Sequence, residues 1–343
     1  MKTLKGSILL LFLGLMSAGL FNNVHAQTKA DVIKSYNKAF DYAKSNDYQQ
    51  AITAYVQTIS MADKVGSEAS DIKEKAESKL PALHFRLAAQ HYKEFKNQQN
   101  LEQLNDAIDS FTETIDVAKK YNNSDIASRA QSIVPKLFYT KSIYLFKTSK
   151  YQESLDALDQ AINIDPKYAK AYYQKGIVMK NMDKNNWEKA IDMFDKAIQV
   201  GLSTNDQQIV TKAENAAREE LVYQGAQATK DKHYKDAVNI LNKALDYDAK
   251  SPNAYYRLAE AYNKQAMWNQ ALNSADKALK YEKGSKTDLA KIYFEKGTAL
   301  KGLGNKSAAC SAFEQAAYGS FKASAEHQME YELKCKQLSQ NTN

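Results

Sequence analysis

The chain has 343 residues, with 47 Lys and Arg against 40 Asp and Glu and a formal net charge of +7. This basic excess is small and dispersed, which argues against a nucleic-acid-binding protein, because such proteins concentrate Lys and Arg in one patch or stripe. No apolar run of membrane length follows the first 26 residues, so no integral membrane segment is expected beyond them.

The first 26 residues are organised like a secretory signal peptide. Lys2 and Lys5 precede an apolar run at 8–15, and a small-residue cleavage pattern ends at Ala26. A retained anchor helix is the alternative, but the run is short for a membrane span. Neither cysteine of the chain lies near this site, which excludes a lipid anchor on an N-terminal cysteine. We therefore expect an exported protein, periplasmic or secreted, that is not lipid-anchored.

Beyond the leader, a pattern of large, small and aromatic residues recurs along the chain. It is clearest at Tyr255, Ala259, Tyr262 and Ala271, and Ala237 lies 34 residues before Ala271. Further small residues equivalent to Ala271 stand at Ala51, Ala107, Ser154, Ala190 and Ala309. A period of this length, with small residues where two short helices cross, resembles the tetratricopeptide repeat (TPR).

The resemblance to TPR proteins implies an all-α fold, a right-handed superhelical solenoid of about seven helix pairs. We expect this solenoid over 27–320, with three irregular repeats followed by four regular ones. A capping helix at 321–338 and a disordered tail at 339–343 should follow. Small residues should let the first helix of a pair approach the second, at Gly176, Gly225, Ala259 and Gly297. Aromatic residues should close the turn within each pair, at Tyr48, Tyr151, Trp187, Tyr234 and Trp268.

In TPR proteins the first helix of each pair lines the concave face, so the resemblance also implies a binding groove. One aromatic series occupies equivalent places on these helices, with a break at Val222: Tyr36, Tyr139, Tyr173, Tyr256 and Phe294. A lysine series lies near the ends of the same helices: Lys44, Lys93, Lys147, Lys180, Lys230, Lys264 and Lys301. An aromatic floor with a basic rim suits an acidic peptide.

The same two series have an ordinary structural interpretation. Aromatic residues and lysines are common at these positions of the repeat, and a lysine near a helix C-terminus is stabilised by the helix dipole alone. The lysines do not reproduce the lysine and asparagine clamp with which chaperone-binding members hold a C-terminal carboxylate. A ligand of that kind is therefore not expected.

The two cysteines indicate a disulfide near the C-terminal end. Cys310 lies one position after Ala309, on the side of its helix that faces the last helix, and Cys335 lies on that last helix. A bond between them would hold the terminal helix over the end of the solenoid, and an oxidising compartment favours it. Two buried free thiols are the alternative. On the same helix a second stripe, Ala325, Met329 and Leu333, either packs inward or marks a docking surface.

Enzyme chemistry has little support in the sequence. His84 and His91 are two helical turns apart, too far to share a metal ion, and phosphate-binding and hydrolase motifs are missing. We expect no cofactor and no metal. The sequence predicts a non-enzymatic scaffold of the cell envelope that binds a protein or peptide, with an acidic segment favoured. The alternative is a glycan-binding accessory protein of the envelope whose tyrosines face sugar rings.

Overall fold

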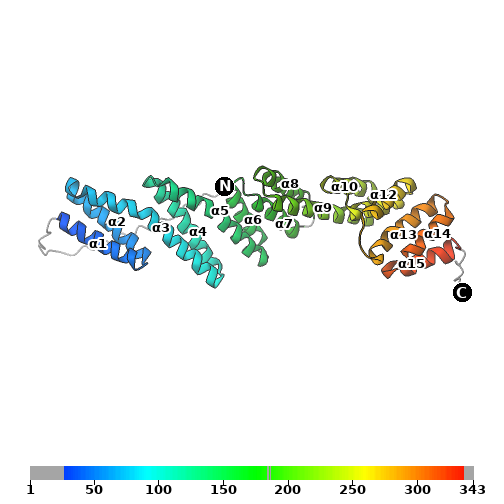
Figure 1. Ribbon diagram of the computed structural model, residues 1–343, viewed down its shortest axis with the longest axis horizontal. Helices are drawn as coiled ribbons and strands as arrows, with labels where there is room; N and C mark the ends of the chain where they lie inside the picture. Colours follow the sequence, from blue (N-terminus) through cyan, green and yellow to red (C-terminus); the bar gives the residue numbers. More distant parts are fainter. Residues whose placement is uncertain (1–26, 184, 186, 336–343) are drawn as a thin grey trace. The chain divides into compact units, whose positions relative to one another are not determined.

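The computed structural model describes residues 27–183, 185 and 187–335, and every regular element in these ranges is helical (Figure 1). The leader at 1–26 and the predicted tail lie outside the described residues. The α-helices are α1 (Lys29–Lys44), α2 (Tyr48–Val65), α3 (Ser70–Gln98), α4 (Leu101–Lys120), α5 (Ser124–Lys147), α6 (Tyr151–Ile164), α7 (Ala169–Met182), α8 (Trp187–Ser203), α9 (Gln207–Lys230), α10 (Tyr234–Tyr247), α11 (Pro252–Lys264), α12 (Trp268–Tyr281), α13 (Lys286–Gly302), α14 (Lys306–Ala316) and α15 (Lys322–His327).

Consecutive helices pack as helical hairpins. The pairs α1–α2, α5–α6, α7–α8, α9–α10, α11–α12 and α13–α14 each make extensive contact, and each later pair packs on the one before it from α5 onward. The prediction of an all-α fold of repeated helix pairs is confirmed. None of the helices in the described ranges is long and apolar enough to cross a membrane.

The tight turn inside each pair explains why the two helices reverse direction so regularly. One residue adopts a positive φ in five of these turns: Asn46, Ser149, Lys232, Ala266 and Gly304. The next backbone N–H donates to the carbonyl five residues earlier, as from Met267 to Tyr262 at 2.9 Å and from His233 to Ala228 at 2.8 Å. This bond satisfies a carbonyl left free at the end of the first helix. The second helix then begins at the predicted aromatic residue, for example Trp268 in α12.

Small residues at the helix crossings have the predicted role. A Cβ atom at Gly176 would lie 2.6 Å from the Phe194 ring, and one at Gly225 would lie 2.4 Å from Leu241 Cγ. Phe194 and Leu241 are fully buried. The backbone of the first helix therefore rests directly on the side chains of the second, which only a residue without a Cβ permits.

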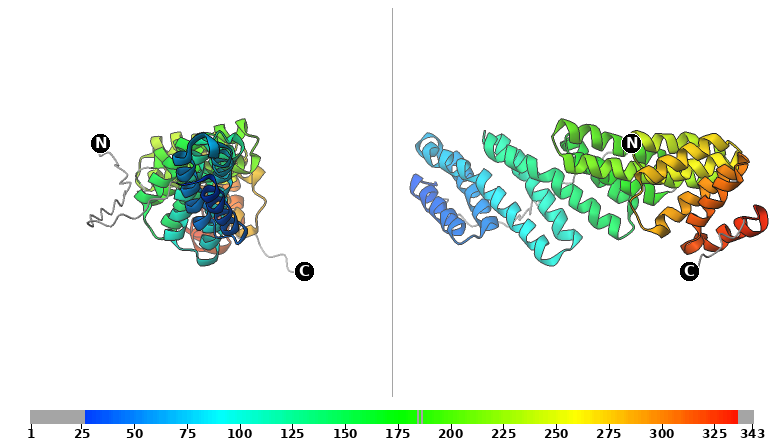
Figure 2. Two further views of the ribbon diagram at one scale, coloured as in Figure 1. Left: turned by 90° about the vertical axis from the view of Figure 1, so that its left-hand side faces the viewer. Right: turned by 45° about the vertical axis from the view of Figure 1, so that its right-hand side comes forward.

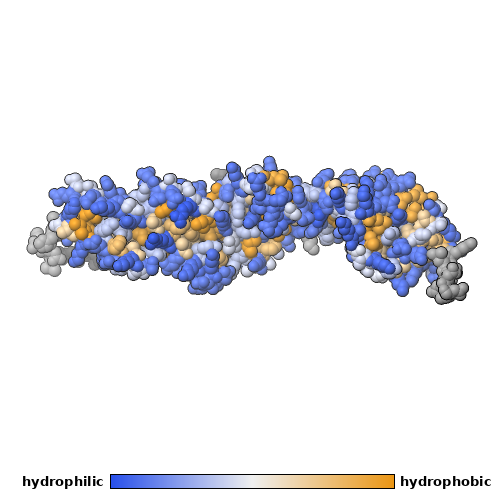
Figure 3. All heavy atoms as spheres, in the orientation of Figure 1, coloured by the Kyte–Doolittle hydropathy of each residue, from blue (hydrophilic) through white to orange (hydrophobic). Residues whose placement is uncertain are grey.

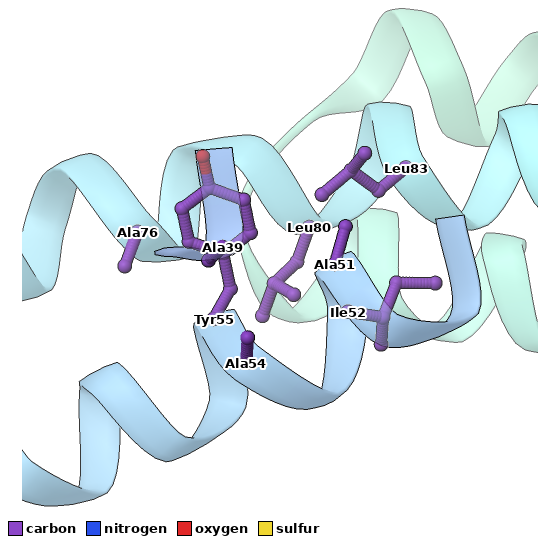
Figure 4. Packing of buried hydrophobic residues seen from close by; sticks show 8 residues of the cluster. All are labelled: Ala39, Ala51, Ile52, Ala54, Tyr55, Ala76, Leu80 and Leu83. Atoms are coloured by element: carbon purple, nitrogen blue, oxygen red, sulfur yellow. The ribbon is translucent and has the colours of Figure 1, made fainter. Parts of the chain in front are cut away.

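The described chain divides into two compact units. The first holds the residues up to Leu87 together with Val117–Asn123, and the second holds Ala88–Asp116 and the residues from Ser124 onward. In the core of the first unit, Tyr55 of α2 lies beside Ala39 of α1, and Leu80 and Leu83 of α3 complete the cluster (Figure 4).

Most of the surface in Figure 3 is hydrophilic, with apolar side chains gathered in separate patches.

In the second unit, α3 and α4 are joined by a hydrogen bond of 2.7 Å between His91 Nδ1 and Ser110 Oγ.

The C-terminal end differs in part from the predicted single helix. A 3-10 turn (Gly319–Phe321) leads into the short α15, and a π-helical turn, η4 (Gln328–Glu332), follows it. Cys310 and Cys335 form a disulfide with their Cα atoms 5.9 Å apart, as predicted. The stripe of Ala325, Met329 and Leu333 packs inward on α13 and α14.

Candidate functional site

Two of the predicted groove aromatics, Tyr139 and Tyr173, line one cleft in the second unit. Its other lining residues are Tyr168, Lys170, Gln208, Ile209 and Lys212, and its volume is about 240 Å³. We call this set of seven residues the central cleft. Its walls come from α5, α7 with its preceding residue, and α9, which are the first helices of three consecutive pairs. The central cleft therefore opens on the helices that the resemblance assigned to the groove.

The length of α9 creates one wall of the central cleft. Asp206 caps this helix by accepting a hydrogen bond of 3.2 Å from the Ile209 backbone N–H. The helix then runs for 24 residues, against 14 in α7. The additional turns at its start carry Gln208, Ile209 and Lys212 toward Tyr173. Sequence reasoning missed these three residues, although the Asp206 cap so far before Gly225 was a readable sign of a longer helix.

Tyr139 and Tyr168 are neutral hydrogen-bonding groups with apolar faces. Tyr139 and Tyr168 meet edge to face, with ring centroids 5.6 Å apart. Burial raises the pKa of the Tyr168 hydroxyl to about 12, with a smaller contribution from Tyr139. Burial also raises the pKa of Tyr139, with a smaller contribution from Tyr173. Each of these two hydroxyls thus stays protonated at physiological pH and can donate a hydrogen bond to a ligand.

Lys170 and Lys212 supply the charge of the central cleft. Both are exposed. In the described part of the chain, neither side chain forms an ion pair. Two ammonium groups beside three phenol rings favour a ligand that combines carboxylates with an apolar or aromatic group.

The remaining predicted aromatics are engaged in packing. Tyr36, in the first unit, meets Tyr55 edge to face at 5.3 Å. Tyr256 is only 7% exposed, and burial raises the pKa of its hydroxyl to about 12. The ring of Phe294 lies 5.4 Å from both Phe313 and Phe321. Tyr256 therefore presents little free ring surface, whereas Tyr36 and Phe294 are half-buried, as Tyr139 and Tyr173 are.

The predicted lysines fall into two registers. Lys180 and Lys301 lie seven residues after the aromatic of their helix, whereas Lys44, Lys147, Lys230 and Lys264 lie eight residues after the aromatic position. One residue turns a side chain by about 100° around a helix. The four lysines at the second spacing are exposed, whereas Lys180 and Lys301 are half-buried and paired. Lys93 is also exposed.

The position seven residues after the aromatic position, which is half-buried in Lys180 and Lys301, connects one repeat to the next. Lys180 Nζ lies 3.0 Å from Glu220 Oε2 of α9, and Lys301 Nζ lies 3.1 Å from Glu332 Oε2. At the same place in α11, Asn263 donates to Glu295 Oε2 of α13 at 2.8 Å. Lys180 and Lys301 therefore hold neighbouring elements together. Among the described residues, no group of three or more His, Cys, Asp and Glu side chains is placed to hold a metal ion.

Models of one repeat family match three parts of the second unit. They are described as TPR repeat, at 145–183, and as tetratricopeptide repeat, at 228–293 and at 290–318. The matched ranges contain four of the turns described above, at Ser149, Lys232, Ala266 and Gly304. The chain is a tetratricopeptide repeat protein.

One curated relative matches part of the chain. The heat shock protein sti1 homolog of Schizosaccharomyces pombe is 34% identical over 97 residues, which are 28% of this chain and 16% of that protein. The chain thus matches less than a fifth of the length of this relative.

Several solved structures are similar at low identity. YrrB, a TPR protein with an unusual peptide-binding site, is 19% identical with a TM-score of 0.36, covering 57% of this chain and 91% of its own. The MamA protein is 16% identical with a TM-score of 0.38, and the match covers 59% of this chain and 97% of the MamA chain. A tetratricopeptide repeat protein from Parabacteroides merdae is 14% identical with a TM-score of 0.27, covering 87% and 97%. At these scores the likeness says nothing about the ligand of this chain.

Proposed function

We propose that this protein is a non-enzymatic scaffold whose central cleft binds an acidic peptide segment of a protein partner. The observation that carries the proposal is the meeting of Tyr139, Tyr168 and Tyr173 with the exposed Lys170 and Lys212. Rigid stacked helices hold these groups in place before a ligand arrives, so little conformational entropy is lost on binding. The aromatic faces supply contact area, and the two lysines attract and orient carboxylates.

We further propose that the protein works in the cell envelope, in the periplasm or outside the cell. Two features support this location. The leader pattern is that of an exported protein. The Cys310–Cys335 disulfide is of the kind that persists in oxidising compartments.

Selection from a random peptide library displayed on phage tests the proposed ligand. We expect the full-length mature protein to enrich sequences that combine Asp or Glu with an aromatic residue. Reversing both charges in Lys170→Glu/Lys212→Glu should weaken binding of a selected peptide at least tenfold in fluorescence anisotropy, and added salt should weaken it in the wild type. The matched control is Lys230→Glu, an exposed lysine of the same helix outside the cleft.

Two results would contradict the proposal. One is an equal loss of peptide binding in the control and in the double variant, and the other is enrichment of peptides that carry no acidic residues. Oligosaccharide binding that disappears in Tyr173→Ala, without any peptide binding, would replace the peptide with a glycan as the ligand.

A further inference from the structure

The residues from Gly319 to Cys335, here named the C-terminal segment, cover the last helix pair (Figure 2). Ala325 is fully buried, and Met329 and Leu333 pack on the cluster of Phe313 and its neighbours. The segment can turn back onto α13 because Gly319 adopts a positive φ of 53°. A Cβ there would also lie 2.7 Å from Thr287 Cγ2.

Two side chains of the last helix pair receive groups of matching chemistry from this segment. Phe294 is the aromatic and Lys301 the lysine of the groove series in α13, and we name these two residues the end subsite. The Phe321 ring lies 5.4 Å from the Phe294 ring. Lys301 Nζ donates to Gln328 Oε1 at 2.8 Å and to Glu332 Oε2 at 3.1 Å. The chain therefore places an aromatic ring and a carboxylate of its own on the end subsite.

The spacing of these groups shows what kind of segment fits. Gln328 and Glu332 follow Phe321 by seven and eleven residues, so in a helix all three share one face. A partner helix with an aromatic residue and a glutamate at such positions would present the same chemistry to Phe294 and Lys301.

In the inner repeats the corresponding contacts are made by the first helix of the next pair. Lys180 is paired by Glu220 of the 24-residue α9, and Asn263 by Glu295 of the 17-residue α13. The C-terminal segment has only a 6-residue α-helix and a π-helical turn. In that turn the Leu333 N–H donates to the Gln328 carbonyl at 2.9 Å. Short helices are marginal by themselves, and π turns are rare, so this element depends on other bonds to stay in place.

The disulfide supplies such a bond. It joins Cys335, at the far end of the segment, to Cys310 of α14 across a sequence separation of 25 residues. In the chain-entropy model, closing a loop of this size shifts the docking equilibrium by roughly a few hundredfold. Among the described residues, the C-terminal segment is the one element packed on a groove residue that a disulfide also holds in place.

We propose that the Cys310–Cys335 disulfide is a redox lock that keeps the end subsite occupied by the chain itself. A dithiol reductant transfers two electrons and two protons to the disulfide. The S–S bond breaks, two thiols form, and the reductant becomes a disulfide. The C-terminal segment then detaches reversibly, and Phe294 and Lys301 become available to a partner helix that carries an aromatic residue and a glutamate. This site is separate from the central cleft and does not depend on the function proposed for it.

Hydrogen exchange and peptide binding on the full-length mature protein test the lock. Amides in 319–335 should exchange at least tenfold faster after reduction with dithiothreitol than in the oxidised protein. A fluorescent synthetic peptide of residues 319–332, which contains no cysteine, should bind the reduced protein at least tenfold more tightly than the oxidised one. The tethered segment still competes after reduction, so the peptide must be used at millimolar concentration as well as below it. Equal exchange and equal binding in the two redox states would overturn the proposal.

Two variants assign the result to the end subsite. Cys310→Ser/Cys335→Ser should behave like the reduced protein without any reductant, with its fold checked by far-ultraviolet circular dichroism. Adding Lys301→Met to this double-serine variant should weaken its binding of the peptide at least fivefold. Loss of the peptide in Lys170→Glu/Lys212→Glu, with Lys301→Met unaffected, would place the peptide in the central cleft and overturn the lock. If the serine variant fails to fold, reversible reduction of the wild type decides the question.

Discussion

Glu295 of α13 is a carboxyl group almost completely enclosed between two helices. Burial raises its pKa from 4.5 to about 7, against the opposing effect of the Asn263 hydrogen bond. The groups that face it from α11 are Asn263, Glu260, Lys264 and Arg257. Asn263 Oδ1 is buried without a hydrogen-bond partner. A protonated Glu295 can supply that partner, because its hydroxyl is a donor that the carboxylate lacks.

A dependence of stability on pH follows from this residue. The folded protein binds the proton more tightly than the unfolded chain, so stability from Glu295 is complete below about pH 4.5 and is lost as pH rises to about 7. We expect urea unfolding of the second unit to show about 2–3 kcal/mol more stability at pH 5 than at pH 8 from this group.

Glu295→Gln tests the assignment to Glu295. A neutral amide keeps an acceptor for Asn263 and offers a donor to Asn263 Oδ1, so the variant should be more stable than the wild type at pH 8 and should lose this part of the pH dependence. The matched control is Glu314→Gln, at an exposed position of α14. An unchanged pH profile in Glu295→Gln would show that Glu295 is not the titrating group.

At the scale of elements, the contact between the two helices of a pair depends on a missing side chain. The clearest case is Gly225 of α9, whose added Cβ would lie within 2.4 to 3.2 Å of three atoms of Leu241. Leu241 is fully buried in a cluster with Ala237, Leu258 and Ala261, so it can give way only if its neighbours also shift. The pair α9–α10 is therefore sensitive to even one methyl group at this crossing.

We predict that Gly225→Ala lowers the free energy of unfolding by about 1–2 kcal/mol. Overpacking costs about 1–3 kcal/mol, and the higher helix propensity of alanine offsets up to about 1 kcal/mol of it. Chemical denaturation of the single and double variants measures this. In a Leu241→Ala background, where the space is vacated, the same change should be neutral or stabilising. A destabilisation of equal size in both backgrounds would rule out the Leu241 contact as the cause.

At the scale of the whole molecule, two compact units with separate cores predict unfolding in more than one step. Repeat proteins gain stability from contacts between neighbours, so a unit with more helix pairs and a disulfide should outlast a smaller one. Both tryptophans, Trp187 and Trp268, belong to the second unit. Tryptophan fluorescence therefore reports that unit, whereas far-ultraviolet circular dichroism reports both.

We expect circular dichroism to change at lower urea concentration than tryptophan fluorescence. A variant that moves the reporter checks the assignment: Trp187→Phe/Trp268→Phe/Phe40→Trp places the only tryptophan on an exposed position of α1. Its fluorescence should follow the earlier transition. Superimposable curves from all three measurements would mean that the molecule unfolds as one cooperative body.

Most of the fold was predictable because its determinants are local and repeated. A small residue such as Gly176 indicates a helix crossing, and an aromatic residue such as Trp268 indicates the start of a second helix. The pairing of Cys310 with Cys335 was predictable because Cys310 lies next to the small residue of the last crossing. The central cleft was only half predictable. Tyr139 and Tyr173 belong to the repeat pattern, but Lys170 and Lys212 lie outside it.

The lysine series shows the same division. Counting along the chain placed Lys180 and Lys264 in one series, yet Lys180 is paired with Glu220 of α9 and Lys264 is exposed to solvent. A difference of one residue is small in a sequence of variable repeats, but it turns a side chain by about 100°.

The sequence by itself therefore determined the class of protein, the helix pairs and the disulfide, because small residues, turns and cysteines act through their immediate neighbours. Only the tertiary structure decided which groove residues are free. That outcome depends on helix length and rotation, and on what each following element places on the one before it. The long α9 forms one wall of the central cleft, while Phe294 and Lys301 are covered by the chain's own C-terminal segment.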